Sequence, residues 1–156
     1  MREIHGSLPQ AAGGQSRLRA LGYCGAVPLI VLAVWLFAIA PDHPWHEGTI
    51  LLLKTYAAML LSFLGGTRWG AVLAKDDDGT AATIALLPAL SAWIALLLPP
   101  AVAFAGLAVA FAAQGAWDSL AAHAGSLPVW YGALRARLTV IAVATMILAF
   151  AATVWT

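Results

Sequence analysis

The chain has 156 residues, of which 62% are hydrophobic and 10% charged, whereas a typical soluble domain is about 45–50% apolar and about 25% charged. This composition argues strongly against a soluble single-domain enzyme and against a disordered chain, and it indicates an integral membrane protein. The formal net charge of +1 lacks the basic excess of nucleic-acid-binding proteins, and the single cysteine excludes an intrachain disulfide.

Five stretches are mostly apolar over roughly the 20 residues that a helix needs to cross a bilayer. In chain order they cover residues 21–40, 50–74, 81–98, 101–122 and 138–155. The first is longer than the apolar part of a secretory signal, so we expect a retained helix. Pro28 and Pro88 lie inside the first and third spans and are expected to kink them. Pro99 and Pro100 end the third span and begin the fourth in a tight turn.

The predicted fold class is therefore an all-α membrane protein, a bundle of five transmembrane helices. Residues 18–156 form this single domain, and residues 1–17 are expected to be a flexible tail. Seven of the eight basic residues fall on one side of the spans: Arg2, Arg17, Arg19, Arg68, Lys75, Arg135 and Arg137. Lys54 lies near the opposite interface, towards which it can snorkel. By the positive-inside rule, the amino terminus is cytoplasmic and the carboxyl terminus outside.

Two spans carry small residues at four-residue spacing, which places them on one helix face. The expected helix-packing residues are Ser62, Gly65, Gly66 and Gly70 in the second span and Gly106 and Ala110 in the fourth. Small residues let helix backbones approach closely in lipid. We therefore expect the second and fourth spans to meet along these faces.

Charged residues inside spans cost ~2.5–3.5 kcal/mol near the bilayer centre, so they are usually paired. Lys54, Leu61 and Arg68 are seven residues apart and share one face of the second span. Arg68 and Asp118 fall at similar depths near the cytoplasmic interface, so they are predicted to face each other or to form a cluster with Gln114. Three interpretations remain open: a salt bridge that fixes helix register, a functional polar pocket, or snorkelling to lipid headgroups.

The segment YAAMLLSFLGGTRWG, residues 56–70, resembles the signature of the membrane-protein family called domain of unknown function 3429. That family includes the eukaryotic mitochondrial transmembrane protein 69. The resemblance covers residues 18–150 and is supported by residues 87–93, by Trp130 and Tyr131, by residues 134–139, and by Gln114 and Asp118. It implies an integral membrane protein without implying an activity, and we expect residence in the bacterial inner membrane.

If the family shares a site, the resemblance places it on the cytoplasmic side between the second, fourth and fifth spans. The candidate polar cluster consists of Ser62, Arg68, Trp69, Gln114, Asp118, Arg135 and Arg137. Ordinary packing and positive-inside anchoring would explain the same residues without a ligand.

The remaining polar residues are weaker signals. His43 and His46 lie three residues apart beside Asp42 and Glu47, where a metal site is conceivable but a solvated loop is favoured. The acidic run 76–78 is expected to be a solvated turn. The sequence contains no phosphate-binding loop, HExxH motif or nucleophile elbow, so no catalytic set, metal or cofactor is expected.

Two main functions follow from this pattern. The first is a structural, accessory or assembly protein of a membrane complex, because small residues line the helices and no catalytic set is present. The second is a binder or carrier of a small molecule or lipid, with a polar site between the second and fourth spans. A membrane enzyme is the least favoured. The expected partners are the lipid bilayer and other membrane proteins or a second copy of the chain, and nucleic acid is not expected.

Overall fold

A computed structural model describes residues 10–73, 80–125 and 129–155. The regular structure in these ranges is helical throughout: α1 (Gln10–Ala38), α2 (His46–Leu73), α3 (Thr80–Ala85), α4 (Leu87–Leu97), α5 (Pro100–His123) and α6 (Val129–Val154). Within the described ranges, α1, α2, α5 and α6 are long and apolar enough to cross a membrane. The predicted all-α class and its membrane-protein character are confirmed.

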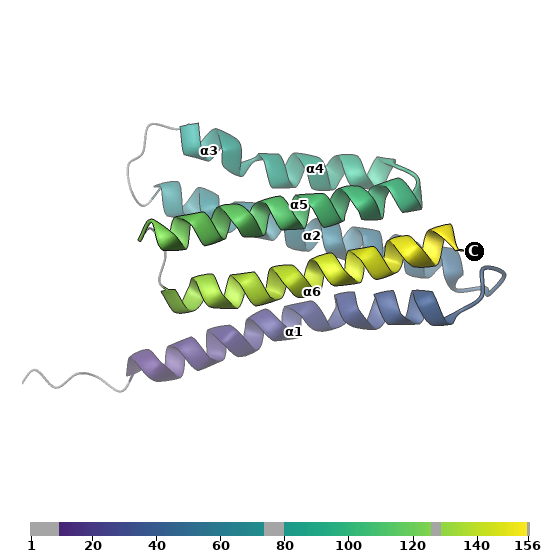
Figure 1. Ribbon diagram of the computed structural model, residues 1–156, viewed down its shortest axis with the longest axis horizontal. Helices are drawn as coiled ribbons and strands as arrows, with labels where there is room; N and C mark the ends of the chain where they lie inside the picture. The colour runs from purple at the N-terminus through teal and green to yellow at the C-terminus, as the bar shows by residue number, and fades with distance from the viewer. Residues whose placement is uncertain (1–9, 74–79, 126–128, 156) are drawn as a thin grey trace, which may run out of the picture.

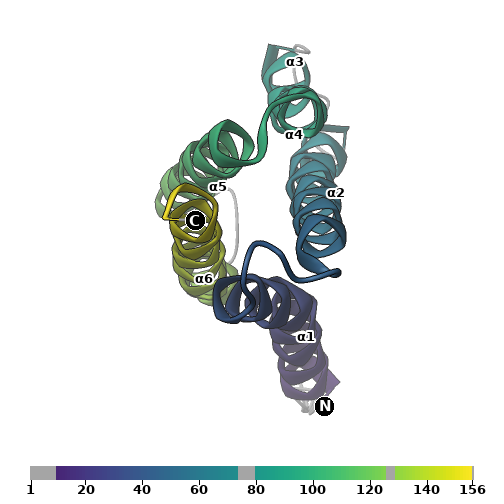
Figure 2. The same cartoon turned by 90° about the vertical axis from the view of Figure 1, so that its right-hand side faces the viewer.

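The long helices and α4 run side by side along the molecule (Figure 1). Seen end-on, they form a ring in which α1, α2, α4, α5 and α6 follow one another and α6 packs back onto α1 (Figure 2). α2 also reaches across the ring to α5. The start of α1 and the end of α6 lie at opposite ends of the bundle (Figure 1).

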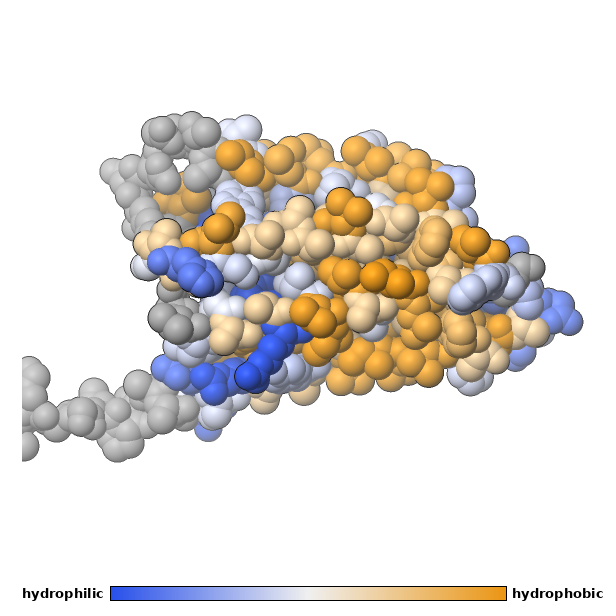
Figure 3. Space-filling model, viewed as in Figure 1, coloured by the Kyte–Doolittle hydropathy of each residue, from blue (hydrophilic) through white to orange (hydrophobic). Residues whose placement is uncertain are grey.

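The inside of the ring is filled by large side chains. The largest fully buried ones are Phe104, Leu29, Leu36, Leu53, Leu61, Leu107, Met146 and Asp118. Many apolar side chains instead point outward, and Figure 3 shows them covering the middle of the bundle, with hydrophilic residues towards its ends. An apolar exterior of this extent is expected where lipid replaces water.

The third apolar stretch is two helices rather than one, because α3 and α4 are interrupted at Leu86. The interruption lies two residues before Pro88, whose ring nitrogen has no N–H to donate to the preceding turn. At the break, Leu86 N donates to Thr83 O at 3.2 Å. This bond reaches back three residues, as in the tighter 3₁₀ turn. Pro28 does not interrupt α1, which runs through it as one helix.

Two helices begin before the boundaries predicted for the domain and for the fifth span. α1 begins at Gln10, so residues 10–17, expected in a flexible tail, are helical, and α6 begins at Val129 rather than at 138. Charged residues end an apolar stretch in the sequence, but arginine is a good helix former and the helix continues past it. Residues 1–9 of the expected tail, Lys75 and the acidic run 76–78 lie outside the described residues.

The expected small-residue contact between the second and fourth spans is wrong for three glycines. A Cβ added to Gly66, Gly70 or Gly106 would meet nothing within 4 Å. Ser62 is half-buried, and its hydroxyl donates to Ala58 O within its own helix. Ala110 is half-buried and packs against the core. The rotation of each helix follows the large and charged side chains that it buries, so these three glycines turn away from the other helices.

Close helix contacts occur at the remaining expected glycine, Gly65, and at Gly115. A Cβ added to Gly65 would lie 2.9 Å from Ala85 O and 3.2 Å from Pro88 Cβ, so Gly65 lets α2 approach the break between α3 and α4. A Cβ added to Gly115 would overlap the Thr139 side chain, so Gly115 lets α5 approach α6.

Lys54 points into the ring, which makes the snorkelling prediction wrong. Its side chain is buried, and Nζ donates to Leu98 O at 2.7 Å and to Leu96 O at 3.3 Å. These carbonyls lie at the end of α4, just before Pro99 and Pro100, neither of which has an amide N–H. Lys54 therefore supplies donors at a helix end where the two prolines offer none.

Candidate functional site

Asp118 is the centre of the polar cluster at one end of the ring. It lies on α5, is 1% exposed, and is one turn beyond Gln114 on the same face. Asp118 Oδ1 accepts a hydrogen bond from Gln114 Nε2 at 3.3 Å. Asp118 Oδ2 accepts a hydrogen bond from Arg135 Nε at 2.8 Å and a second, from Arg135 Nη2. α5 and α6 are thus joined by a doubly bonded ion pair.

Arg68 approaches the same carboxylate from α2. Its Nε lies 2.9 Å from Asp118 Oδ1, but the N–H is not directed at an acceptor, so this contact is mainly electrostatic. Arg68 Nη2 donates to Trp117 O at 2.9 Å, and Arg68 Cζ lies 4.6 Å from the centre of the Trp117 ring. A guanidinium at this distance from an indole ring is held by a cation–π interaction. The predicted pairing of Arg68 with Asp118 is present in the structure.

The cluster carries more positive than negative charge. Within the described ranges, two guanidinium groups share the single carboxylate of Asp118. Their side chains are 12% exposed for Arg68 and 4% for Arg135, so little water is present to screen the surplus. Gln114 Oε1 is buried and has no hydrogen-bond partner. A buried acceptor without a donor costs free energy. The cluster therefore has both an uncompensated positive charge and an unsatisfied hydrogen-bond acceptor.

The cluster lies a little inside one end of the bundle. Arg68 and Asp118 are each five residues before the end of their helices, and Arg135 is six residues after the start of α6. At 1.5 Å per residue, this is about 8–9 Å from the helix ends. Arg19 at the same end is exposed, and its Cζ lies 5.7 Å from the centre of the Trp130 ring. This basic end is where the cluster is nearest to solvent.

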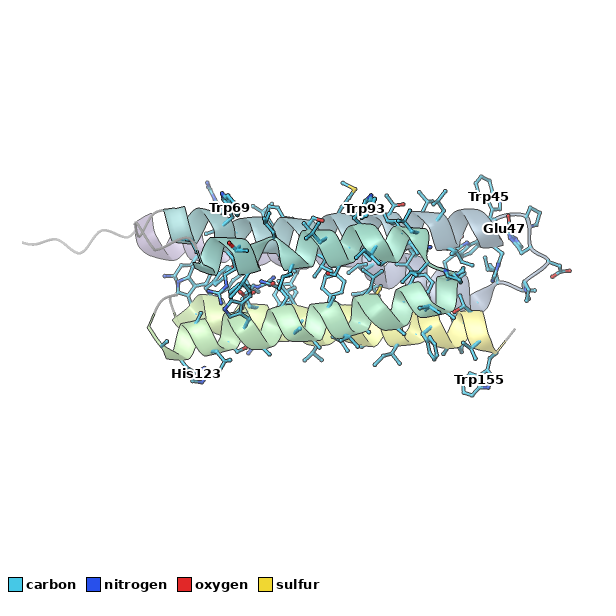
Figure 4. All side chains as sticks on the ribbon, turned by 90° about the horizontal axis from the view of Figure 1, so that it is seen from above. Trp45, Glu47, Trp69, Trp93, His123 and Trp155 are labelled. Atoms are coloured by element: carbon cyan, nitrogen blue, oxygen red, sulfur yellow. The ribbon has the colours of Figure 1, made fainter. Side chains whose placement is uncertain are left out.

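Three residues of the expected cluster are not in contact with it. Trp69 is 38% exposed and points outward (Figure 4), and Arg137 is exposed. Ser62 bonds within its own helix. The cluster that the structure assembles consists of Arg68, Gln114, Asp118 and Arg135, with Trp117 in addition. Trp117 directly precedes Asp118 in the sequence and contacts Arg68.

The loop before α2 and the first turn of α2 hold the other candidate ligand set. His43 Nδ1 accepts a hydrogen bond from Trp45 N at 3.2 Å, and His46 is buried with Nε2 unpartnered. Asp42 and Glu47 are exposed. Over the part of the chain that the structure describes, no group of three or more His, Cys, Asp or Glu side chains is placed to hold a metal.

Comparison with known proteins places this chain in a family. The model described as "Protein of unknown function (DUF3429)" matches residues 15–151. Transmembrane protein 69 of Xenopus tropicalis is 31% identical over 131 residues, which are 81% of this chain and 51% of that protein. The chain thus spans about half the length of this relative, and no solved structure matches significantly. Because the family match covers nearly the whole helical domain, the chain belongs to the DUF3429 family of membrane proteins.

Proposed function

We propose that the protein binds a small molecule or a lipid through the cluster of Arg68, Gln114, Asp118 and Arg135. The observation that carries this proposal is the buried, unpartnered Gln114 Oε1 beside two guanidinium groups that share one carboxylate. A cluster built only to lock helices together gains nothing from a surplus charge or an unsatisfied acceptor, since both cost free energy in a poorly solvated site. A ligand would compensate both.

In the membrane, we propose that α3 and α4 together form a fifth crossing, with the amino terminus in the cytoplasm. Five crossings are supported by the start of α1 and the end of α6 lying at opposite ends of the bundle (Figure 1). The orientation is supported by Arg17, Arg19 and Arg137, which are exposed near the end that holds the cluster. The cluster would then face the cytoplasm. We propose the bacterial inner membrane as the location.

Native mass spectrometry tests the binding proposal. The full chain is purified from its own membrane in mild detergent, and its mass is compared with those of Arg68→Gln and Arg137→Gln. The two variants remove the same charge at the same end, but Arg137 lies outside the cluster. We expect a bound species that Arg68→Gln loses and Arg137→Gln keeps. A protein that carries no bound species, and whose Tm no added anion or lipid raises, would refute the proposal.

A second candidate is a non-enzymatic accessory or assembly protein of a membrane complex. It is favoured by the arrangement of ion pairs, because one carboxylate joins α2, α5 and α6 and would keep the bundle rigid without a ligand. Its partners would be other membrane proteins or a second copy of the chain. Mild-detergent purification from native membranes tests it: we expect a defined complex larger than the single chain. Elution as a monomer at every detergent concentration would contradict it.

A further inference from the structure

The chemistry of the cluster narrows the class of ligand, given the proposed binding function on which this inference rests. Arg68 is the most exposed of the three charged side chains, at 12% against 4% for Arg135 and 2% for Asp118. Arg135 is engaged twice by Asp118 Oδ2, whereas Arg68 makes its contact with Oδ1 without directing the N–H at it. The surplus positive charge is therefore located mainly at Arg68, and a negative group on the ligand would approach there.

Besides the negative group that Arg68 attracts, the ligand must satisfy a second requirement, which comes from Gln114. Its Nε2 and Arg68 Nε contact the same carboxylate oxygen, Asp118 Oδ1, so the amide and the guanidinium lie side by side. Gln114 Oε1 needs a hydrogen-bond donor. Turning the amide over would place its oxygen against the carboxylate oxygen, so the orientation with Oε1 free is the favourable one. The ligand must therefore offer a negative oxygen and a donor close together.

We infer that the cluster takes a singly protonated oxyanion of the phosphomonoester type, with a negative oxygen on Arg68 and the P–O–H group donating to Gln114 Oε1. A phosphate monoester has its second pKa near 6, so it keeps such a proton close to neutral pH. A phosphodiester and sulfate carry negative oxygens but no proton to donate. The phosphate can belong to a lipid headgroup or to a soluble molecule, since both present the same chemistry to the basic end.

A ligand series on the wild-type protein tests this class without any mutation. Binding of methyl phosphate, dimethyl phosphate and sulfate is measured by calorimetry on the detergent-solubilised full chain at pH 6 and pH 8. We expect methyl phosphate to bind about tenfold tighter than the other two at pH 6, from one additional hydrogen bond at a charged site. We expect this preference to shrink at pH 8. Tighter methyl phosphate binding at pH 8 than at pH 6 would overturn the inference, because it would mean that charge alone is recognised.

The same ligand series also controls for titration of the protein's own groups between pH 6 and pH 8. Arg68 faces the ligand from α2, Asp118 from α5 and Arg135 from α6, and His123 lies one turn past Ser119 on α5. Protonation of any of these groups would change the binding of sulfate and dimethyl phosphate as well, since neither of these ligands titrates between pH 6 and 8. Only the loss of the ligand's own proton would change the binding of methyl phosphate while leaving the binding of sulfate and dimethyl phosphate unchanged.

Two nanodisc preparations distinguish a lipid from a soluble source. One contains phosphatidic acid, whose headgroup is a phosphomonoester, and the other phosphatidylglycerol, a phosphodiester. Retention of phosphatidic acid in preference to phosphatidylglycerol supports the lipid source, and methyl phosphate binding in both preparations supports the soluble source. Equal binding of monoesters and diesters would overturn the class while leaving the proposed binding function intact, and no binding of any of these ligands or lipids would refute both.

Gln114→Met connects the result to the cluster. This variant removes the amide at nearly constant side-chain size and leaves both ion pairs of Asp118 in place. We expect phosphomonoester binding to weaken about tenfold relative to sulfate binding measured on the same variant. Unchanged phosphomonoester binding in Gln114→Met would contradict the assignment of the donor to Gln114.

Discussion

Arg68 Nε on α2 lies 2.9 Å from Asp118 Oδ1 on α5, while the other oxygen of that carboxylate is bonded twice by Arg135 on α6. Within the described ranges, α2 and α6 do not pack directly on each other. The carboxylate of Asp118 therefore connects helices on opposite sides of the ring. It fixes their relative position near the basic end of the bundle.

Asp118→Asn should destabilise the bundle strongly, because it leaves two poorly solvated guanidinium groups without a negative partner. Removing one partner of a buried ion pair costs about 3–5 kcal/mol. The free energy of unfolding in mixed micelles, followed by circular dichroism, measures the effect. The exposed Asp42 at the other end provides a matched control, and Asp42→Asn should change stability by less than about 0.5 kcal/mol. Equal effects of the two variants would mean that the ion pairs contribute no stability.

The Arg68–Asp118 contact should appear as a coupling in a double-mutant cycle. Arg68→Gln should cost more stability in the wild-type background than in Asp118→Asn, with a coupling of about 0.5–3 kcal/mol. Exchanging the two charges is a poorer design, because an arginine at position 118 would face Arg135. Additive effects of Arg68→Gln and Asp118→Asn would show that the 2.9 Å contact carries no energy.

The depth of the charged residues could be predicted from the sequence, but the rotation of each helix could not. Depth follows from the uniform rise of the α-helix, so counting along the second and fourth spans was enough to place Arg68 beside Asp118. Rotation depends on all neighbouring side chains at once. Arg135 belongs to the cluster expected from the family resemblance, but its contact with Asp118, like that of Trp117 with Arg68, has no signature in spacing alone.

Lys54 illustrates the same limit. Its sequence position predicts snorkelling to the interface, whereas the structure buries it. The shared face of Lys54, Leu61 and Arg68 was correctly predicted, and all three turn inward. The sequence does contain the reason for burial, because Pro99 and Pro100 remove amide donors at the end of the preceding helix. That Lys54 is the residue that meets those carbonyls follows only from the packing of α2 against α4.

Burial predicts that Lys54 resists chemical modification. In a Lys75→Arg background, a membrane-impermeant amine reagent should leave Lys54 unmodified in the folded protein and label it after unfolding. Glu47 is exposed near the same end, so Glu47→Lys supplies an accessible lysine for comparison. Mass spectrometry of peptides measures both sites. Labelling of Lys54 as fast as of the lysine introduced at position 47 would show that it snorkels out.

The proposed orientation predicts where a terminal reporter works. A reporter that is active only outside the cytoplasmic membrane should be active when fused after Thr156, and a reporter that functions only in the cytoplasm should be inactive there. Fusions after Ala124, between α5 and α6, should give the opposite pattern, because that segment lies at the basic end. Cytoplasmic activity of the fusion after Thr156 would contradict an odd number of crossings with a cytoplasmic amino terminus.

Two glycines of α5 should respond in opposite ways to the same substitution. Gly115→Ala places a Cβ into the Thr139 side chain of α6 and should destabilise the bundle by about 1–3 kcal/mol, the usual cost of overpacking. Gly106→Ala meets nothing within 4 Å and should be neutral or stabilising by up to about 1 kcal/mol, because alanine is the better helix former. Unfolding in mixed micelles compares them. Adding Thr139→Gly to Gly115→Ala removes the overlapping atoms and should recover much of the loss, whereas a loss that persists would place the cost elsewhere than in the α5–α6 contact.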